Sequence, residues 1–452
     1  NLLTGVYCGD ALTSGTRNSA YGNYALTSED GHGYNVAVGY ASLMTLNAGA
    51  DAYNVAVGYE AGMLLSTGTQ NTIIGGKAGD ALTTGSENVA LGYLALSAED
   101  TGGRNIAIGL GTLQNLNYAG TGYNIAIGYE AGNDVSTGTY NIVIGGLAGD
   151  ALTTGGENVA IGHEALSTED AHGTNVGVGY RALKILDAGV NAYNTAVGHG
   201  AGQSMSTGIQ NVFVGGSAGD AYTTGGQSVG IGFEALSTED DHGGSTAVGY
   251  QALKIQNSGA ANKNVAVGFQ AGTAITSAVR STLIGGHAGD AITTGSDNVA
   301  LGYDSLSANM IGNTNVALGT QSMLTNVAAD RNTAVGYQSL YSMTSPTTLD
   351  TYNVAVGYYA GRSITQGIRN TIMGGLAGDA LTLGSYNTAI GMQALSSETG
   401  GSYNVAVGIG ALEILNTNNA AYNTAVGYNA AQLTSTGEQN TIIGGLAGDA
   451  LT

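Results

Sequence analysis

The chain has 452 residues, with 32 acidic and 11 basic side chains, so its formal net charge is −21. A chain this acidic is poorly suited to bind nucleic acid or anionic lipid, and we expect neither partner. No apolar run approaches the roughly 18 residues of a membrane span, so no membrane insertion is expected, and a single cysteine, Cys8, excludes an internal disulfide framework.

The chain is one repeat from end to end. Near-copies of "NVAVGYEAG" at 54–62 recur throughout, and with their Asn as position 1 the chain divides into 26 units, the last of them truncated. Most units have 17 residues, and a larger period of 70 residues groups them in fours. We therefore predict one continuous solenoid over 1–452. Its super-repeats are expected at 1–70, 71–140, 141–210, 211–280, 281–369 and 370–439, with a partial one at 440–452.

Each unit begins with a short strand. Positions 2 to 4 read Val-Ala-Val or Ile-Ala-Ile, and position 5 is Gly in every unit, which indicates a positive φ or a neighbouring backbone too close for a Cβ. A second short strand is predicted at the x-Ala-Leu or x-Ala-Gly segment that follows. Because 17 residues cannot bury a core of their own, the units must stack, and the fold class expected is all-β, a parallel β-roll or β-solenoid of about 26 coils.

Three columns of the repeat carry packing predictions. The aliphatic residue at position 4 is expected to be buried in nearly every coil, and the Asn column at position 1 is expected to form a side-chain ladder. Position 3 is Ala or Gly in 19 units and large in the first unit of each super-repeat, where position 6 is usually Gly. We interpret this matched change as a tight contact between copies of the chain, which predicts a homo-oligomer. The large residues are Leu3, Ile73, Val143, Phe213, Leu283, Ile372 and Ile442.

Some units are longer than 17 residues. Their additional residues are expected to form loops on one edge, because the strand positions around them keep register. The 19-residue units are 35–53, 105–123, 175–193, 245–263 and 404–422. The unit at 332–352 has 21 residues and contains Pro346, and it is expected to make the largest bulge.

The quoted repeat resembles two known families. The N-[VIT]-A-[VIL]-G core with a following Ala resembles the head repeats of trimeric autotransporter adhesins, and "NTAVGYQSL" at 332–340 is similar to the "NTAVGYQAL" repeats of phage tail-fibre proteins. The resemblance covers the whole chain. It implies a left-handed roll assembled as a parallel homotrimer, neither of which follows from the periodicity. The 17- and 19-residue units are longer than the usual adhesin coil, and no stalk or anchor segment is present in 1–452.

The acidic residues fall in columns. Position 10 is Asp once per super-repeat, and the next coil often carries Glu-Asp at positions 12 and 13. Stacking could bring such groups, for example Asp80, Glu99 and Asp100, around a calcium ion, but we favour turns and solvated loops and expect no metal site. The Asp column is Asp10, Asp80, Asp150, Asp220, Asp290, Asp379 and Asp449. The pairs are Glu29-Asp30, Glu99-Asp100, Glu169-Asp170 and Glu239-Asp240, with Asn309-Met310 and Glu398-Thr399 in the remaining places.

No pattern indicates catalysis. His32, His172 and His242 follow three of the acidic pairs at position 15, which invites a metal or acid–base role, but they recur as parts of the repeat rather than forming one site. Cys8 replaces the Ala of position 8 and is expected to be a small buried residue. "GGxAGDA" lacks the lysine and the strand-to-helix context of a phosphate loop. We therefore expect no catalytic or cofactor-binding residue.

Tyrosines form two columns, which we interpret mainly as packing ladders or contacts between chains, with glycan binding as the alternative. Position 6 holds Tyr40, Tyr59, Tyr93, Tyr129, Tyr250, Tyr303, Tyr358 and Tyr428. The position before the Asn holds Tyr34, Tyr53, Tyr123, Tyr193, Tyr352 and Tyr422.

These patterns predict a non-enzymatic structural fibre or filament segment outside the cell or on its surface. A phage tail fibre on a virion is the alternative, and an ice-binding solenoid is a minor one, disfavoured because "TTG" or "STG" is broken on two coils of four. The partners expected are other copies of the chain, in a homotrimer or stacked end to end, and cell-surface glycans. Because the last coil stops thirteen residues in without a cap, we expect the chain to continue or to stack on another subunit.

Overall fold

A computed structural model of the chain describes residues 1–257, 259, 262–345 and 347–451. The described residues form an all-β parallel solenoid of about 26 turns, as the sequence predicts, and contain no helix. None of them therefore forms a helix that could span a bilayer. The chain divides into two compact units, Asn1–Gln227 and Ser228–Thr452, which we describe separately.

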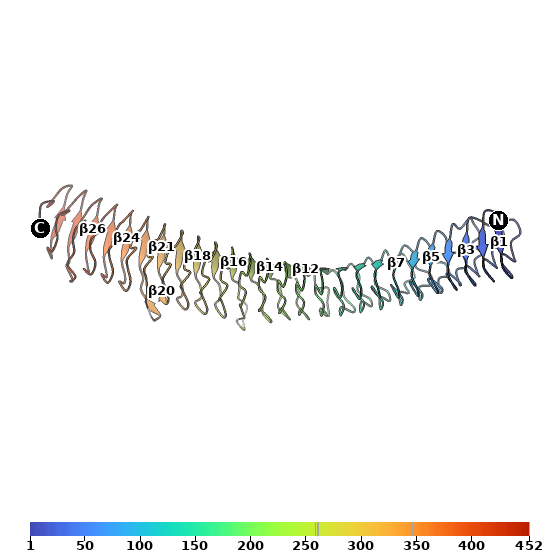
Figure 1. The fold of residues 1–452 in the computed structure, drawn as a ribbon. Helices are drawn as coiled ribbons and strands as arrows, with labels where there is room; N and C mark the ends of the chain where they lie inside the picture. The colour runs from blue at the N-terminus through green and yellow to red at the C-terminus, as the bar shows by residue number, and fades with distance from the viewer. Residues whose placement is uncertain (258, 260–261, 346, 452) are drawn as a thin grey trace. The chain divides into compact units, whose positions relative to one another are not determined.

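Unit 1 has one three-residue strand in each coil (Figure 1). These strands are β1 (Leu2–Thr4), β2 (Ser19–Tyr21), β3 (Val36–Val38), β4 (Val55–Val57), β5 (Thr72–Ile74), β6 (Val89–Leu91), β7 (Ile106–Ile108), β8 (Ile125–Ile127), β9 (Ile142–Ile144), β10 (Val159–Ile161), β11 (Val176–Val178), β12 (Thr195–Val197) and β13 (Val212–Val214).

Unit 2 repeats this arrangement and adds one small second sheet. Its main strands are β14 (Val229–Ile231), β15 (Thr246–Val248), β16 (Val265–Val267), β17 (Thr282–Ile284), β18 (Val299–Leu301), β19 (Val316–Leu318), β21 (Thr333–Val335), β23 (Val354–Val356), β24 (Thr371–Met373), β25 (Thr388–Ile390), β26 (Val405–Val407), β27 (Thr424–Val426) and β28 (Thr441–Ile443). The two-residue strands β20 (Ala329–Asp330) and β22 (Leu349–Asp350) pair with each other in parallel.

Strands of successive coils pair in parallel and in register whatever the coil length. Thr72 pairs with Val89 across a 17-residue coil, and Val36 pairs with Val55 across a 19-residue coil. The additional residues therefore lie outside the strand, as predicted, in loops at the same place in each long coil. Backbone hydrogen bonds such as Ala52 N–H to Gly33 O (3.2 Å) join the end of such a loop to the preceding coil. Parts of the loop expected at 245–263 (258 and 260–261) and the bulge expected at Pro346 lie outside the described residues.

The corner after each strand requires glycine for both of the reasons expected. Gly58 has φ +145°, and a Cβ there would lie 2.4 Å from the carbonyl oxygen of Gly75 in the next coil. Left-handed residues follow at positions 7 and 9, for example Leu94 and Leu96 with φ 57° and 55°. Because left-handed residues cannot extend a strand, the second strand that we predicted in each coil is absent from the described residues, and a turn stands in its place.

The faces of the strand are the reverse of those predicted. Position 3 points into the coil, where Ala56 and Ile73 are fully buried, whereas position 4 points outward, where Leu91 is 40% and Leu301 48% exposed. The prediction of a buried position 4 is therefore wrong. The small residues at position 3 reflect the narrow interior of the coil itself, so they are not evidence for contact between chains.

The large residues at position 3 are matched inside the core rather than at position 6. Ile73 packs toward two glycines at position 9, since a Cβ on Gly62 or Gly79 would lie 3.0 or 3.5 Å from its Cδ1 atom. In the next coil, where position 3 is Ala90, position 9 is the buried Leu96, whereas the coil before Ile73 combines Ala56 with Gly62. A large residue at position 3 or at position 9 can therefore fill the core of a coil, and Ile73 also fills the space beside Gly62.

The Asn column is a ladder, although mainly one between side chain and backbone. Asn71 is fully buried, and its backbone N–H donates to Asn54 Oδ1 at 2.9 Å. Its side-chain Nδ2 donates to the carbonyl oxygen of Gly85, 14 residues on, at 2.9 Å. Each Asn thus joins its own coil to the preceding one, and an unpaired amide at this depth would destabilise the fold by about 1–3 kcal/mol.

Candidate functional site

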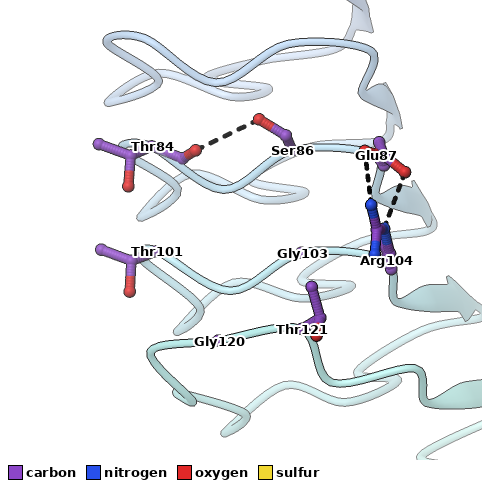
Figure 2. A pocket seen from close by; sticks show the side chains of 8 residues that line it. All are labelled: Thr84, Ser86, Glu87, Thr101, Gly103, Arg104, Gly120 and Thr121. Carbon is purple, nitrogen blue, oxygen red and sulfur yellow. Dashed lines mark hydrogen bonds and ion pairs between the residues drawn. The ribbon is translucent and has the colours of Figure 1, made fainter.

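The surface of unit 1 carries a polar hollow of about 260 Å³ that crosses three coils (Figure 2). Thr84 and Thr101 stand at one end and the Glu87–Arg104 pair at the other, with Gly103 between them. Small residues, Gly and Ser, occupy the polar return of each coil here and leave room for the hollow. The lining residues are Thr84, Ser86, Glu87, Thr101, Gly103, Arg104, Gly120 and Thr121.

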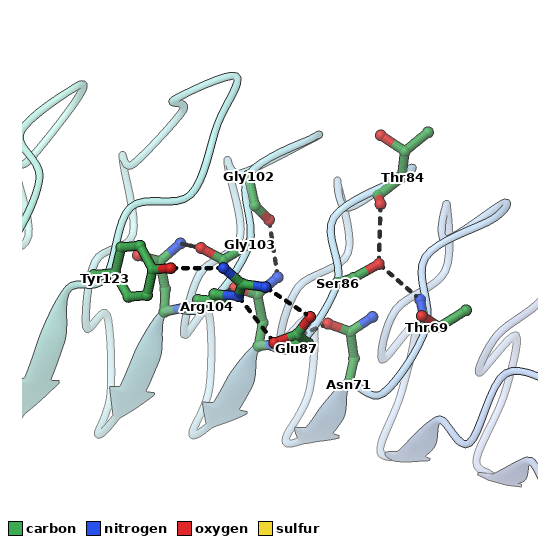
Figure 3. Close-up of polar contacts among 11 residues, drawn as sticks. Thr69, Asn71, Thr84, Ser86, Glu87, Gly102, Gly103, Arg104 and Tyr123 are labelled. Atoms are coloured by element: carbon green, nitrogen blue, oxygen red, sulfur yellow. Dashed lines mark hydrogen bonds and ion pairs between the residues drawn. The ribbon is translucent and has the colours of Figure 1, made fainter.

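Charge in the hollow is already paired (Figure 3). Arg104 donates from Nε and Nη2 to the two carboxylate oxygens of Glu87, at 2.9 and 3.3 Å, and from Nη1 to Tyr123 Oη at 2.6 Å. The guanidinium lowers the pKa of the Glu87 carboxyl, and Glu87 and Tyr123 raise the pKa of Arg104. These groups are exposed, so the pair contributes little to stability, and few of its donors are left for a ligand.

A matching hollow of about 230 Å³ lies one super-repeat later. Glu157 replaces Glu87 there, but Thr174 stands where Arg104 would be. The shape of the hollow therefore belongs to the repeat, whereas its charge does not. Hydroxyl and backbone groups around a shallow hollow suit a neutral polar ligand such as a sugar, and no catalytic pair of side chains converges on either hollow.

The three acidic residues that we weighed as calcium ligands, Asp80, Glu99 and Asp100, do not gather around one point in the structure. Asp80 is half-buried, and burial raises its pKa despite the nearby Lys77. In the described part of the chain, His, Asp and Glu atoms gather closely enough to share an ion in two places, and neither includes Asp80, Glu99 or Asp100. The groups are Glu29, Asp30 and His32, and Glu169, Asp170, His172 and Asp187.

The Glu of the acidic pair is not in a solvated loop, as we had expected, but fully buried. The Oε1 atom of Glu99 accepts the backbone N–H of Gly102, three residues on, at 2.7 Å. Asn309, which we had noted only as a missing Glu, makes the same turn with Gly312 N at 2.8 Å. Position 12 therefore supplies an internal acceptor to the turn. In the sequence, this turn could have been recognised by Glu or Asn at position 12, where many other coils have Leu. Gly or His follows three residues later, at position 15.

The three histidines at position 15 each lie beside one of these buried glutamates. The Nδ1 atoms of His32, His172 and His242 are 3.5, 3.9 and 3.9 Å from an oxygen of Glu29, Glu169 and Glu239. Sequence proximity thus predicted a real juxtaposition.

Cys8, by contrast, is only half-buried, with its thiol near the carbonyl oxygen of Ala20 at 3.4 Å.

The tyrosines form ladders along the outside of each unit. Tyr40 and Tyr59 at position 6 stack with ring centroids 5.5 Å apart, and Tyr403 and Tyr422, before the Asn, stack at 4.9 Å. Arginines share the second column and cover neighbouring rings, as Arg104 does with Tyr123 at 5.5 Å. Rings that stack in this way are still exposed, as Tyr59 and Tyr422 are, each at 53%.

A scan against models of protein families finds no match to this chain. A search of curated proteins likewise finds no significant relative.

Proposed function

We propose that this chain is a non-enzymatic structural segment of an extracellular fibre, in which copies of the chain pack against each other along the outer face of the sheet. The observation that carries the proposal is the apolar stripe: the outward residues of positions 2 and 4, which are aliphatic or Thr in nearly every coil. Exposed large residues in it include Val38, Leu91, Ile127, Val197, Ile231, Ile284, Leu301, Met373 and Ile390.

The stripe supports association because of its continuity. Each β-branched or leucine residue at position 4 stacks on the one a coil away, since the strands are in register, as with Ile108 and Ile127. Monomeric soluble proteins seldom expose a contiguous apolar surface of this extent. The stripe also replaces position 3 as the reason to expect an oligomer. The resemblance to trimeric adhesin heads and phage fibres favours three parallel chains on a cell surface or a virion.

A structural role also accounts for the groups that could have suggested chemistry. The buried glutamates accept hydrogen bonds inside turns and recur with the coil, and Arg104, which lines the hollow, is already paired with Glu87. Glycan binding by the exposed tyrosine columns stays a prediction and would suit a fibre that attaches to surfaces.

The proposal that chains associate through the apolar stripe is tested by measuring the molecular mass of the protein in solution. Sedimentation equilibrium is expected to give three times 44.9 kDa. Changing Leu91, Ile108 and Ile127 to Glu should shift the mass toward one chain, because three adjacent carboxylates would have to enter an apolar interface. The matched control changes Thr67, Thr84 and Thr101 to Glu at exposed loop positions of three successive coils and should leave the mass unchanged. A monomeric wild-type chain would overturn the proposal.

A further inference from the structure

The second acidic group in unit 1 combines ligands from two successive coils. Glu169, Asp170 and His172 lie in the turn of the coil that contains β10, and Asp187 lies in the coil that contains β11. One ligand atom from each of the four lies within 4.8 Å of the others. Glu169 is fully buried, while the two aspartates open to the surface. The group therefore lies at the boundary between core and solvent.

Elsewhere the same buried glutamate is satisfied by the protein. Both oxygens of Glu99 accept backbone N–H groups, from Gly102 at 2.7 Å and from Tyr118 at 3.3 Å. Glu398 likewise accepts the N–H of Gly401 at 2.6 Å and that of Thr417 at 3.2 Å. In these two coils position 15 is Gly, and the turn has no place for a ligand.

Glu169 differs from Glu99 in that one of its oxygens has no partner. Oε1 accepts the N–H of His172 at 3.3 Å, but Oε2 is buried without a hydrogen bond, and so is His172 Nδ1. A buried oxygen left unpaired destabilises the fold, and more so when it is charged. An acceptor oxygen and an imidazole nitrogen facing the same space are satisfied together by a cation, and a ring nitrogen and a carboxylate are both common ligands.

The charges around Glu169 also favour the binding of a cation. Asp170 and Asp187 place two further carboxylates close to the buried Glu169. Arg181 and Lys184, which belong to the same coil as Asp187, form ion pairs with Glu164 instead. No Lys or Arg ion pair to these three carboxylates occurs among the described residues. Three carboxylates without a counter-charge would be stabilised by a divalent cation.

We propose that Glu169, Asp170, His172 and Asp187 bind one divalent transition-metal ion, for which Zn²⁺ is the probe. The mixed nitrogen and oxygen donors favour Zn²⁺ over Ca²⁺, which prefers oxygen ligands alone. Bond lengths of about 2.0–2.2 Å require the surface aspartates to rotate inward. The ion would join two coils at their loop edge. This site is independent of the proposed fibre contact, which uses positions 2 and 4 of the strand, whereas the site uses positions 12, 13 and 15.

Two other turns have the same Glu and His positions, and they indicate where a similar metal site is not expected or is expected to be weaker. Glu29, Asp30 and His32 form a similar group, but Asn47 stands at the position of Asp187, so a weaker site is expected there. In unit 2, Glu239 Oε2 accepts the amide N–H groups of Gln256 and Asn262, and no oxygen is left for an ion.

The experiment measures Zn²⁺ binding to the full chain by equilibrium dialysis after treatment with EDTA. Wild-type protein should bind one Zn²⁺ more tightly than any other, and 1 mM Ca²⁺ (about the level at which weak extracellular calcium sites fill) should not displace it. His172→Gly and Asp187→Asn should each weaken this site by at least about tenfold. Glu99→Gln, in the turn satisfied by backbone, is the control and should have no effect.

Both site variants introduce residues that occupy the same positions in another coil, Gly102 and Asn117, so the fold should be retained, and circular dichroism checks this. A second readout is the ring signal of His172 in NMR spectra, which should shift on addition of Zn²⁺. The proposal is overturned if the wild-type chain binds no Zn²⁺, or if the double variant His172→Gly/Asp187→Asn binds it as tightly as the wild type.

Discussion

At the residue scale, the glycine of position 5 sets the distance between coils. Gly374 has φ +141°, and a Cβ there would lie 2.4 Å from the carbonyl oxygen of Gly391 in the next coil. Its neighbour Gly375 has no atom within 4 Å of such a Cβ and no positive φ in the range that favours glycine. Two adjacent glycines therefore have different reasons to be present, and only the first is required by the backbone.

We predict that Gly374→Ala destabilises unit 2 by at least about 2 kcal/mol, because the new methyl group meets backbone that cannot move without parting two coils. Gly375→Ala should change stability by no more than about 0.5 kcal/mol. Urea unfolding followed by circular dichroism gives both values. Equal effects of the two substitutions would show that the stacking of the coils is looser than the structure indicates.

At the scale of the coil, the side chains at positions 3 and 9 fill the same part of the buried core. The coil that begins at Asn71 combines Ile73 with Gly79, whereas the coil that begins at Asn105 combines Ala107 with Leu113. Both are fully packed, and the leucine adopts the left-handed conformation that the glycine has, with φ 47° against 50°. The two arrangements are therefore alternative solutions with the same backbone.

From this sharing we predict that Ile73→Ala alone destabilises unit 1 by about 3 kcal/mol through the cavity that it leaves. Adding Gly79→Leu gives the coil the core residues of the coil at Asn105 and should recover a large part of the loss. The two single variants and the double variant form a cycle whose interaction free energy is measured by urea unfolding. Additive effects would mean that the two positions do not share a volume.

At the scale of the molecule, the 70-residue super-repeat contains a whole number of coils, so each super-repeat begins at the same point of a coil. Gln70 and Tyr140, the residues that end successive super-repeats, have φ 60° and 61°, and each precedes a buried Asn of the ladder. Because each coil contacts mainly the coils on either side of it, stability should be close to a sum over coils and their interfaces.

Deletion of residues 71–140 should accordingly leave a folded chain, with β9 pairing with β4 in place of β5. Circular dichroism is expected to show the same strand signal per residue as the parent chain. Deletion of residues 71–130, which removes a similar length but breaks register, should yield aggregated or partly unfolded protein. A well-folded product from the second deletion would contradict the role of register.

The spacing of Asn and Gly by itself determined the coil length, the register and the solenoid, because a strict period leaves only stacking to bury the apolar residues. It could not determine which side of a three-residue strand faces inward, since Val-Ala-Val offers a small and a large face and either could be buried. The tertiary structure decided this: the narrow interior accepts only Ala at position 3 unless glycines stand beside it, as they do at Ile73. Likewise the sequence placed Glu169 beside His172, but only the next coil showed that Asp187 joins them and that Oε2 lacks a partner, because contacts between coils depend on stacking.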